Sequence, residues 1–146
     1  MEFFALHHLP AELAVRAYKL YGESTIDLLY DDPYLLMDEA LVRSRCREYI
    51  EAMRQFLPAG SRPLYASKAL SIKRMYELMA QENMGIDVVS SGELYTAVSA
   101  GFPVENAFFH GNSKTDQTIR YAMEQGIGYF VCDNVEELDA IEAEAA

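Results

Sequence analysis

Short apolar segments alternate with amphipathic segments along the second half of this chain. The apolar segments are RPLYASKAL (62–70), GIDVVSS (85–91), NAFFHGN (106–112) and IGYFVCDN (127–134). Helical spacing of apolar residues follows them over residues 71–84, 92–102, 114–126 and 135–146. Strands that alternate with helices of this kind form βαβ units, in which the strands are parallel. The sequence therefore predicts an α/β fold with four consecutive βα units.

A long amphipathic helix is predicted before the first unit, over residues 38–56. Asp38 is a candidate N-cap, and Pro58 and Gly60 end the helix. Ser71 and Asn134 are candidate caps of two later helices, and glycines follow two others. The apolar residues that recur at helical spacing in the first helix are Leu41, Val42, Cys46, Tyr49, Ile50, Met53 and Phe56.

Two architectures fit this alternation of strands and helices. The first predicted strand is followed by SKALSIK, which contains neither a dinucleotide-binding glycine fingerprint nor a phosphate-binding P-loop. This leaves a flavodoxin-like sheet, with helices on both faces, or part of a (β/α)8 barrel, with helices on the outer face alone. Polar residues near the strand ends favour the barrel, in which chemistry gathers at the carboxyl ends. They are Ser67, Lys68, Asp87, Ser90, Ser91, His110 and Asn112.

Lys68 is the most informative of these residues. A lysine within an apolar segment is expected to be partly desolvated, which lowers its pKa and frees its amine as a nucleophile. Such an amine most often forms a Schiff base, and pyridoxal phosphate (PLP) is the leading carbonyl cofactor. Three plainer interpretations stay open. The head of Lys68 could reach water, Asp87 could cap a turn after Gly85, and His110 could be a satisfied core or loop histidine.

Composition excludes several classes of partner. The 146-residue chain carries 23 acidic and 12 basic residues, a net charge of −11, which disfavours DNA or RNA as a ligand. Cys46 and Cys132 lack metal-ligand or redox spacing and are expected to be ordinary reduced thiols, with no metal site. No apolar run is long enough to span a membrane, and the first residues lack the pattern of a cleaved leader. We therefore expect a cytoplasmic protein.

Three sequence blocks resemble one enzyme family. LYASKAL (64–70) is similar to a cofactor-lysine block, usually Y-A-V-K-A-N. GIDVVSSGELYTAVSAGFP (85–103) is similar to G-A-D-V-V-S-G-G-E-L followed by A-G-F-P. FFHGNSKTD (108–116) is similar to F-H-G-N-N-K, and YFVCDNVEEL continues in the same manner. Together they resemble the diaminopimelate decarboxylases, PLP enzymes of the alanine-racemase-like barrel group. HGNSK after DVVSSGEL favours this branch over the ornithine and arginine decarboxylases.

The resemblance implies a role for five residues. Lys68 would form the Schiff base with PLP, and Asp87 would lie beside the cofactor on the next strand. Ala66, Glu93 and His110 match further positions that line the pyridoxal site. The implied reaction is the decarboxylation of meso-diaminopimelate to L-lysine and CO2 in lysine biosynthesis. The full-length family is homodimeric.

The resemblance also implies what this chain lacks. Leu70 and Ser67 replace the usual Asn and Val of the lysine block, where we expect tuning rather than loss of chemistry. We expect residues 1–33 to form an N-terminal extension, and residues 34–146 to form the N-terminal half of a PLP-binding (β/α)8 barrel. A complete barrel takes about 250 residues. The glycine-rich phosphate loop and the C-terminal domain would be missing.

The expected fragment would keep Lys68 without holding PLP tightly, and it is expected to be inactive alone. An open half-barrel exposes a strand edge and apolar surface, so it should self-associate or be marginally stable. Two alternatives remain. One is another PLP barrel enzyme, such as an ornithine or arginine decarboxylase or a racemase. The other is a non-catalytic α/β binding module.

Overall fold

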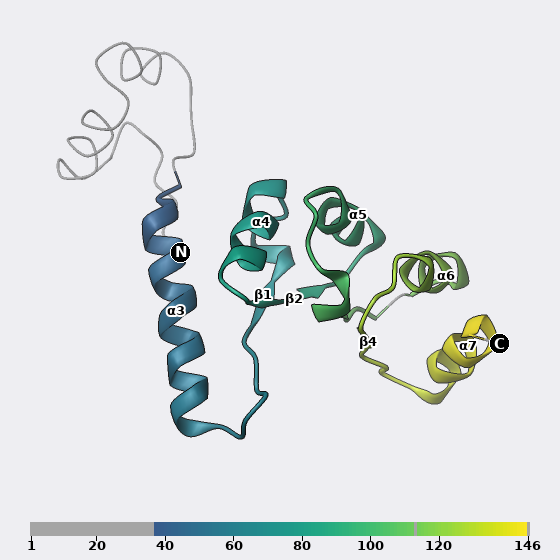
Figure 1. Ribbon diagram of the computed structural model, residues 1–146. Coiled ribbons are helices and arrows are strands. Elements are labelled where there is room, and N and C mark those ends of the chain that lie inside the picture. Colours follow the sequence, from purple (N-terminus) through teal and green to yellow (C-terminus); the bar gives the residue numbers. More distant parts are fainter. Residues whose placement is uncertain (1–36, 113, 146) are drawn as a thin grey trace, which may run out of the picture. The chain divides into compact units, whose positions relative to one another are not determined.

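The computed structural model describes residues 37–112 and 114–145 (Figure 1). The extension predicted over residues 1–33 lies outside the described residues. The strands are β1 (Leu64–Ala66), β2 (Gly85–Val88), β3 (Ala107–Phe109) and β4 (Tyr129–Phe130). The helices are α3 (Glu39–Phe56), α4 (Lys73–Gln81), α5 (Ser91–Ser99), α6 (Asp116–Glu124) and α7 (Val135–Ala145). Two short 3-10 helices, η2 (Ser67–Ala69) and η3 (Val104–Asn106), precede α4 and β3.

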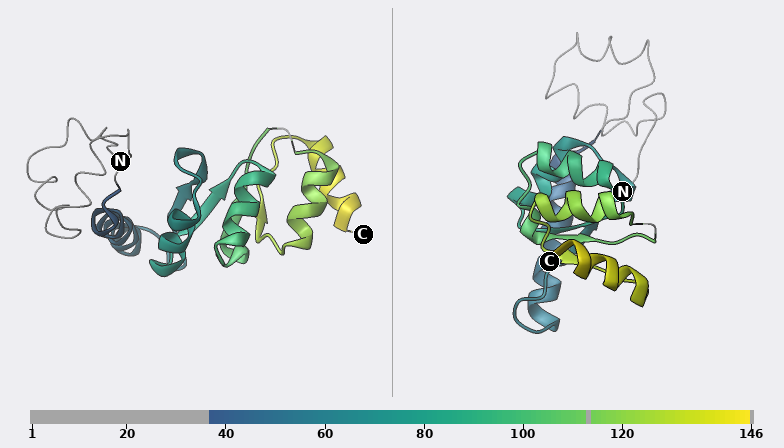
Figure 2. Two further views of the ribbon diagram at one scale, coloured as in Figure 1. Left: turned by 90° about the horizontal axis from the view of Figure 1, so that it is seen from above. Right: turned by 90° about the vertical axis from the view of Figure 1, so that its right-hand side faces the viewer.

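The four strands form one parallel sheet in the order β1-β2-β3-β4. Right-handed crossovers between sequential parallel strands place every connecting helix on the same face of the sheet. Figures 1 and 2 show α4, α5 and α6 side by side along that face. This arrangement confirms the barrel-type prediction, because a flavodoxin-like sheet would carry helices on both faces.

The helix-facing side of the sheet holds the core. Ile86 and Val88 of β2 point there, together with Ala107 and Phe109 of β3, and all four are almost fully buried. Full burial of a large apolar side chain contributes about 1.5–3 kcal/mol. From the helices the core receives Met75, Tyr76, Leu78, Met79, Leu94, Ala97, Ile119 and Ala122. The alternating pattern of the strands therefore buries one face of the sheet against the helices and leaves the other face uncovered by them.

Helix α3 is fastened to the end of α4. Cys46 is buried, with its sulfur 3.9 Å from the sulfur of Met79. Arg43 and Arg47 both donate to the carboxylate of Glu82, at 2.8 Å from Nη1 of Arg43 and 2.7 Å from Nε of Arg47. Hydrogen bonds from Arg47 and then Arg43 lower the pKa of Glu82, against the opposing effect of its burial. The docking of α3 thus depends on an ionised Glu82.

Replacing Glu82 by glutamine is expected to lower the free energy of unfolding by about 1–2 kcal/mol at pH 7. Charge-assisted hydrogen bonds contribute about 1.5–3 kcal/mol, reduced here because Arg47 is exposed. Because the pKa of Glu82 is depressed in the folded state, its contribution is complete above the unfolded value of about 4.3 and is lost as the pH falls through the folded value. Urea unfolding at a series of pH values measures this. Glu48→Gln, at an exposed pair with Arg45, is the control.

Helix ends follow the sequence at some positions and depart from it at others. Asn134 caps α7, since its Oδ1 accepts from the backbone N–H of Glu137 at 2.8 Å, as predicted. The predicted cap by Ser71 is wrong: Ile72 occupies the N-cap, and the Ser71 hydroxyl lies 2.9 Å from the hydroxyl of Tyr76. That contact directs the Ser71 hydroxyl to a side chain of the helix rather than to the free N–H groups of its first turn. None of the helices in the described ranges is long and apolar enough to cross a membrane.

Candidate functional site

A row of four residues crosses the uncovered face of the sheet. Ala66, Asp87, Phe108 and Tyr129 are paired in register on neighbouring strands, so their side chains share that face. The rings of Phe108 and Tyr129 stack with centroids 4.2 Å apart. Asp87 keeps 23% of its side chain exposed. The row therefore sets one carboxylate between a small side chain and an aromatic platform, at the carboxyl ends of the strands.

Lys68 lies just beyond this row, in the 3-10 turn η2 that ends β1. The turn is closed by the N–H of Leu70, which donates to the Ser67 carbonyl at 3.2 Å, and by the Tyr65 hydroxyl, which donates to the Leu70 carbonyl at 3.1 Å. Burial and the neighbouring Tyr76 raise the pKa of Tyr65 to about 12, so this donor stays protonated.

The amine of Lys68 is exposed and has no hydrogen-bond or ion-pair partner among the described residues. The apolar spacing predicted a strand through residue 70 and a partly desolvated amine, and both predictions are wrong for this chain. The strand ends at Ala66, and the 3-10 turn carries Lys68 out into solvent. The plainer interpretation, a lysine whose head reaches water, describes its present environment.

His110 follows β3 and is held against β2. Its backbone N–H donates to the Val88 carbonyl at 2.8 Å, and its Nδ1 lies 3.6 Å from Oδ2 of Asp87. The ring is exposed, so His110 is not a core histidine. Asp87 lies within β2 and does not cap a turn after Gly85. The structure thus brings Asp87 and His110 together at the ends of adjacent strands.

Glu93, another predicted pocket residue, has a structural contact. Ser90 caps α5, with its hydroxyl accepting from the Glu93 N–H at 3.2 Å. The Glu93 carboxylate in turn accepts from the Val89 N–H at 2.7 Å. This reciprocal arrangement resembles a capping box, which satisfies free N–H groups at a helix start. Its role in the pyridoxal site remains a prediction.

Ser67 has a buried hydroxyl without a partner among the described residues. An unsatisfied buried polar group costs about 1–3 kcal/mol. We therefore expect Ser67→Ala to raise the free energy of unfolding by about 1 kcal/mol. Urea unfolding of this variant measures the effect, with Ser61→Ala at an exposed loop position as the control. A loss of stability in Ser67→Ala would show that the hydroxyl has a partner.

Sequence reasoning missed a buried ion pair beside these residues. Lys114 has 1% of its side chain exposed, and its Nζ donates to Oε1 of Glu137 at 2.5 Å. Lys114 belongs to the FFHGNSKTD block, yet its partner lies 23 positions away. A separation of that length leaves no local pattern, so no signal in the sequence indicated the pair.

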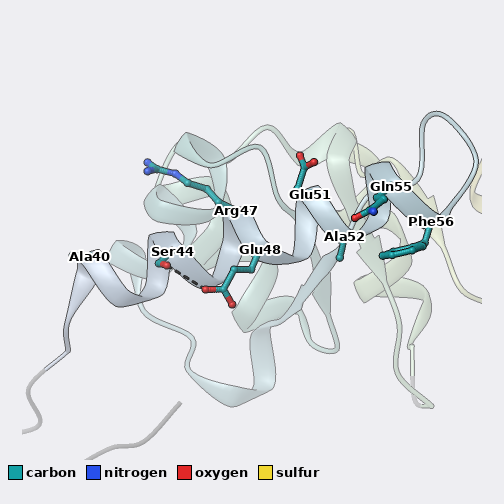
Figure 3. Close-up of a pocket in the computed structure, with 8 residues that line it drawn as sticks. All are labelled: Ala40, Ser44, Arg47, Glu48, Glu51, Ala52, Gln55 and Phe56. Atoms are coloured by element: carbon teal, nitrogen blue, oxygen red, sulfur yellow. Dashed lines mark hydrogen bonds between the residues drawn. The ribbon is translucent and has the colours of Figure 1, made fainter.

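A separate hollow of about 570 Å³ lies along helix α3, away from the strand ends (Figure 3). Two of its lining residues are hydrogen-bonded, since the Ser44 hydroxyl donates to Oε1 of Glu48 at 3.3 Å (Figure 3). The described residues that line it come from α3: Ala40, Ser44, Arg47, Glu48, Glu51, Ala52, Gln55 and Phe56. The Ser44–Glu48 contact is exposed, and none of the described lining residues is a third group that would orient it for catalysis, so the candidate site stays at the sheet.

Metal and disulfide chemistry find no support in the described part of the chain. No group of three or more potential ligands there could hold a metal ion. Cys46 and Cys132 are free thiols, one buried and one exposed.

The parallel strands in sequential order, with helices along one face, define part of a (β/α)8-type barrel. The family described as "Pyridoxal-dependent decarboxylase, pyridoxal binding domain" matches residues 40–146. The chain belongs to this family of pyridoxal-dependent decarboxylases.

Individual relatives agree with this family. A diaminopimelate decarboxylase of Staphylococcus aureus is 42% identical over 135 residues, covering 86% of this chain and 31% of the relative. A structure of diaminopimelate decarboxylase from M. jannaschii with L-lysine matches with a TM-score of 0.72 and 30% identity, over 90% of this chain and 29% of that one. A lysine/ornithine decarboxylase of Vibrio vulnificus with putrescine matches with a TM-score of 0.66 and 27% identity, over 93% and 34%. The chain therefore spans about a third of the length of these relatives.

The chemistry of the residues at the strand ends fits a pyridoxal group. Lys68 offers a primary amine that has no competing hydrogen-bond or ion-pair partner among the described residues. Such an amine can react with the carbonyl group of a cofactor. Asp87 offers a carboxylate, and His110 an imidazole beside it. The aromatic platform of Phe108 and Tyr129 lies in the same row as Asp87.

Proposed function

We propose that this chain supplies the lysine-bearing part of a PLP-dependent diaminopimelate decarboxylase, which converts meso-2,6-diaminopimelate to L-lysine and CO2. The observation that carries the proposal is the placement of Lys68, Asp87 and His110 at the carboxyl ends of three consecutive strands. In barrels of this type, chemistry takes place at that end.

Each proposed residue has a distinct task. The Lys68 amine would bind the cofactor carbonyl covalently. Asp87 and His110 would orient the ring from the neighbouring strands, and Ala66 would leave space beside it. When bound, the cofactor would supply the electron sink for the electron pair left as CO2 departs. Glu93 would act indirectly, because its hydrogen bond with the Val89 N–H would hold the start of α5 beside the site.

The substrate assignment depends on the relatives. Support comes from the 42% identity to a diaminopimelate decarboxylase and from the L-lysine in the matched M. jannaschii structure, which is the product of the proposed reaction. The alternative is a decarboxylase of the ornithine or arginine type, supported by the weaker match to the Vibrio vulnificus enzyme. Activity and assembly into a homodimer, both of which would require the complete barrel, are part of this proposal, and the chain alone is expected to be inactive.

The first experiment asks whether Lys68 reacts with PLP. The purified chain is mixed with PLP, its absorbance spectrum is recorded, and the mixture is reduced with borohydride and mapped by mass spectrometry. We expect a yellow band and a pyridoxyl adduct on Lys68, with both lost in Lys68→Ala. Lys73→Ala, at an exposed lysine at the start of α4, is the matched control and should leave both unchanged.

The adduct pattern also separates the alternative functions. Adducts spread evenly over Lys68 and Lys73, or an unchanged band in Lys68→Ala, would contradict the proposal and favour a non-catalytic binding module. An adduct confined to Lys68 would support a PLP enzyme. The chain joined to the remaining barrel units of a relative would then be tested with meso-diaminopimelate against ornithine and arginine.

A further inference from the structure

The Lys114 ammonium is buried and fully hydrogen-bonded. It donates to the carbonyls of Gly111 and Val131, at 2.8 Å each, and to Oε1 of Glu137 at 2.5 Å. These three acceptors use all three ammonium protons. The group also lies 6.0 Å from the centroid of the Phe109 ring. No ammonium proton of Lys114 is left over for a ligand, so these residues link chain segments and do not form a binding site.

The acidic partner is equally constrained. The second oxygen of Glu137 accepts from the N–H of Asp133 at 2.9 Å, and 9% of the side chain is exposed. Burial alone would raise the pKa of Glu137, but the hydrogen bond from Lys114 and that from Asp133 lower it, so the Glu137 carboxylate stays ionised. Lys114 and Glu137 thus form one saturated salt bridge inside the protein.

The pair joins three chain segments at the carboxyl end of the sheet. Gly111 directly follows His110, Val131 directly follows β4, and Glu137 lies in the first turn of α7. The N–H of Val131 donates to the Phe109 carbonyl at 2.9 Å, where the pairing of β3 with β4 ends. Lys114 bridges the two segments immediately beyond that bond.

The backbone next to His110 is fixed on both sides. Before it, the His110 N–H is bonded to Val88. After it, Gly111 has φ of +123°, and a side chain there would come within 2.8 Å of the Val89 carbonyl oxygen. The carbonyl of Gly111 is held by Lys114. The backbone that carries the imidazole therefore has little freedom to move away from Asp87.

Stability alone does not account for charges at this position. Burying an ion pair is often no more stabilising than well-packed apolar residues of the same volume. We infer that the Lys114–Glu137 pair is a positioning device, which fixes the backbone around His110 and so holds the imidazole against Asp87. Its purpose, to present that imidazole to a pyridoxal ring, rests on the proposed function.

The test uses an apolar replacement of the pair, Lys114→Met with Glu137→Leu, and the milder Glu137→Gln. In ring-labelled protein without PLP, NMR follows the His110 ring signals before and after Asp87→Asn. In the parent chain, Asp87→Asn should displace these signals. In the apolar double variant the displacement should fall to about a third or less, while unfolding in urea stays cooperative. Lys73→Met, the matched lysine control, should leave the displacement unchanged.

The outcomes separate this inference from the proposed function. An undiminished displacement in a folded pair variant would overturn the positioning role. Failure of both pair variants to fold would overturn it too, since the pair would then be a requirement of folding. If the displacement falls as expected but PLP does not react at Lys68, the proposed function fails while the positioning role stands. If PLP reacts at Lys68 and the displacement is unchanged, only the positioning role fails.

Discussion

Replacing Glu137 by leucine is expected to lower the free energy of unfolding by about 3–5 kcal/mol, the usual effect of removing one partner of a buried ion pair. Lys114 has 1% of its side chain exposed, and its ammonium would be left with two carbonyl acceptors and no counter-charge. A typical domain is stable by about 5–15 kcal/mol, so the loss is a large share of the total. Urea unfolding followed by circular dichroism measures it.

A second substitution should reverse most of that loss. Adding Lys114→Met to Glu137→Leu removes the uncompensated charge and supplies apolar volume in its place. We expect the double variant to recover to within about 1 kcal/mol of the parent chain. Arg120→Met with Glu144→Leu, at a more exposed ion pair, is the matched control and should change little. If the single and double variants are equally unstable, the hydrogen bonds of Lys114 matter more than its charge.

The repeating pattern of the sequence predicted the elements that depend on local chemistry. Helical spacing predicted residues 38–56 as a helix, and the structure has Glu39–Phe56. Glycines at 101 and 126 follow α5 and α6 with positive φ, as expected of residues that end helices. The alternation of strands and helices also predicted the parallel pairing, since a right-handed crossover leaves few alternatives.

What the sequence did not predict depends on contacts between distant segments. The strand through RPLYASKAL was predicted to be longer than it is, because a bond from Tyr65 to Leu70 closes a turn that apolar spacing cannot reveal. The approach of His110 to Asp87 requires the register of β2 and β3. The Lys114–Glu137 ion pair could likewise be recognised only from the structure, because in the sequence each residue alone resembles an ordinary surface charge.

Strand β2 contributes both to the core and to the candidate site. On β2, Ile86 and Val88 point into the core while Asp87 points to the other face. A shift of one residue in the register would exchange these faces, placing the carboxylate in the core. The core packing that stabilises the sheet is therefore the same feature that places Asp87 beside His110. Core substitutions near β2 should affect both stability and the site.

Substituting alanine for Gly128 is expected to lower the free energy of unfolding by about 3 kcal/mol, at the upper end of the range for inserting atoms into packed structure. A side chain there would lie 2.1 Å from the Glu105 carbonyl oxygen and 2.7 Å from its carbonyl carbon. Both contacts are with backbone, so no side-chain rotation relieves them. Gly128 leads directly into β4, whose pairing with β3 covers two residue pairs. A shift of residue 128 would therefore displace β4.

Gly126 provides the control for this prediction, two residues earlier in the same connection. It has φ of +77°, and no atom lies within 4 Å of the point where an added Cβ would stand, so Gly126→Ala introduces only backbone strain. That strain costs about 1–2 kcal/mol. Urea unfolding compares the two variants, and the ring signals of Phe108 and Tyr129 report whether β4 has moved. Equal losses in both variants, with unchanged ring signals, would show that η3 yields to the added methyl group and that β4 does not depend on this close approach.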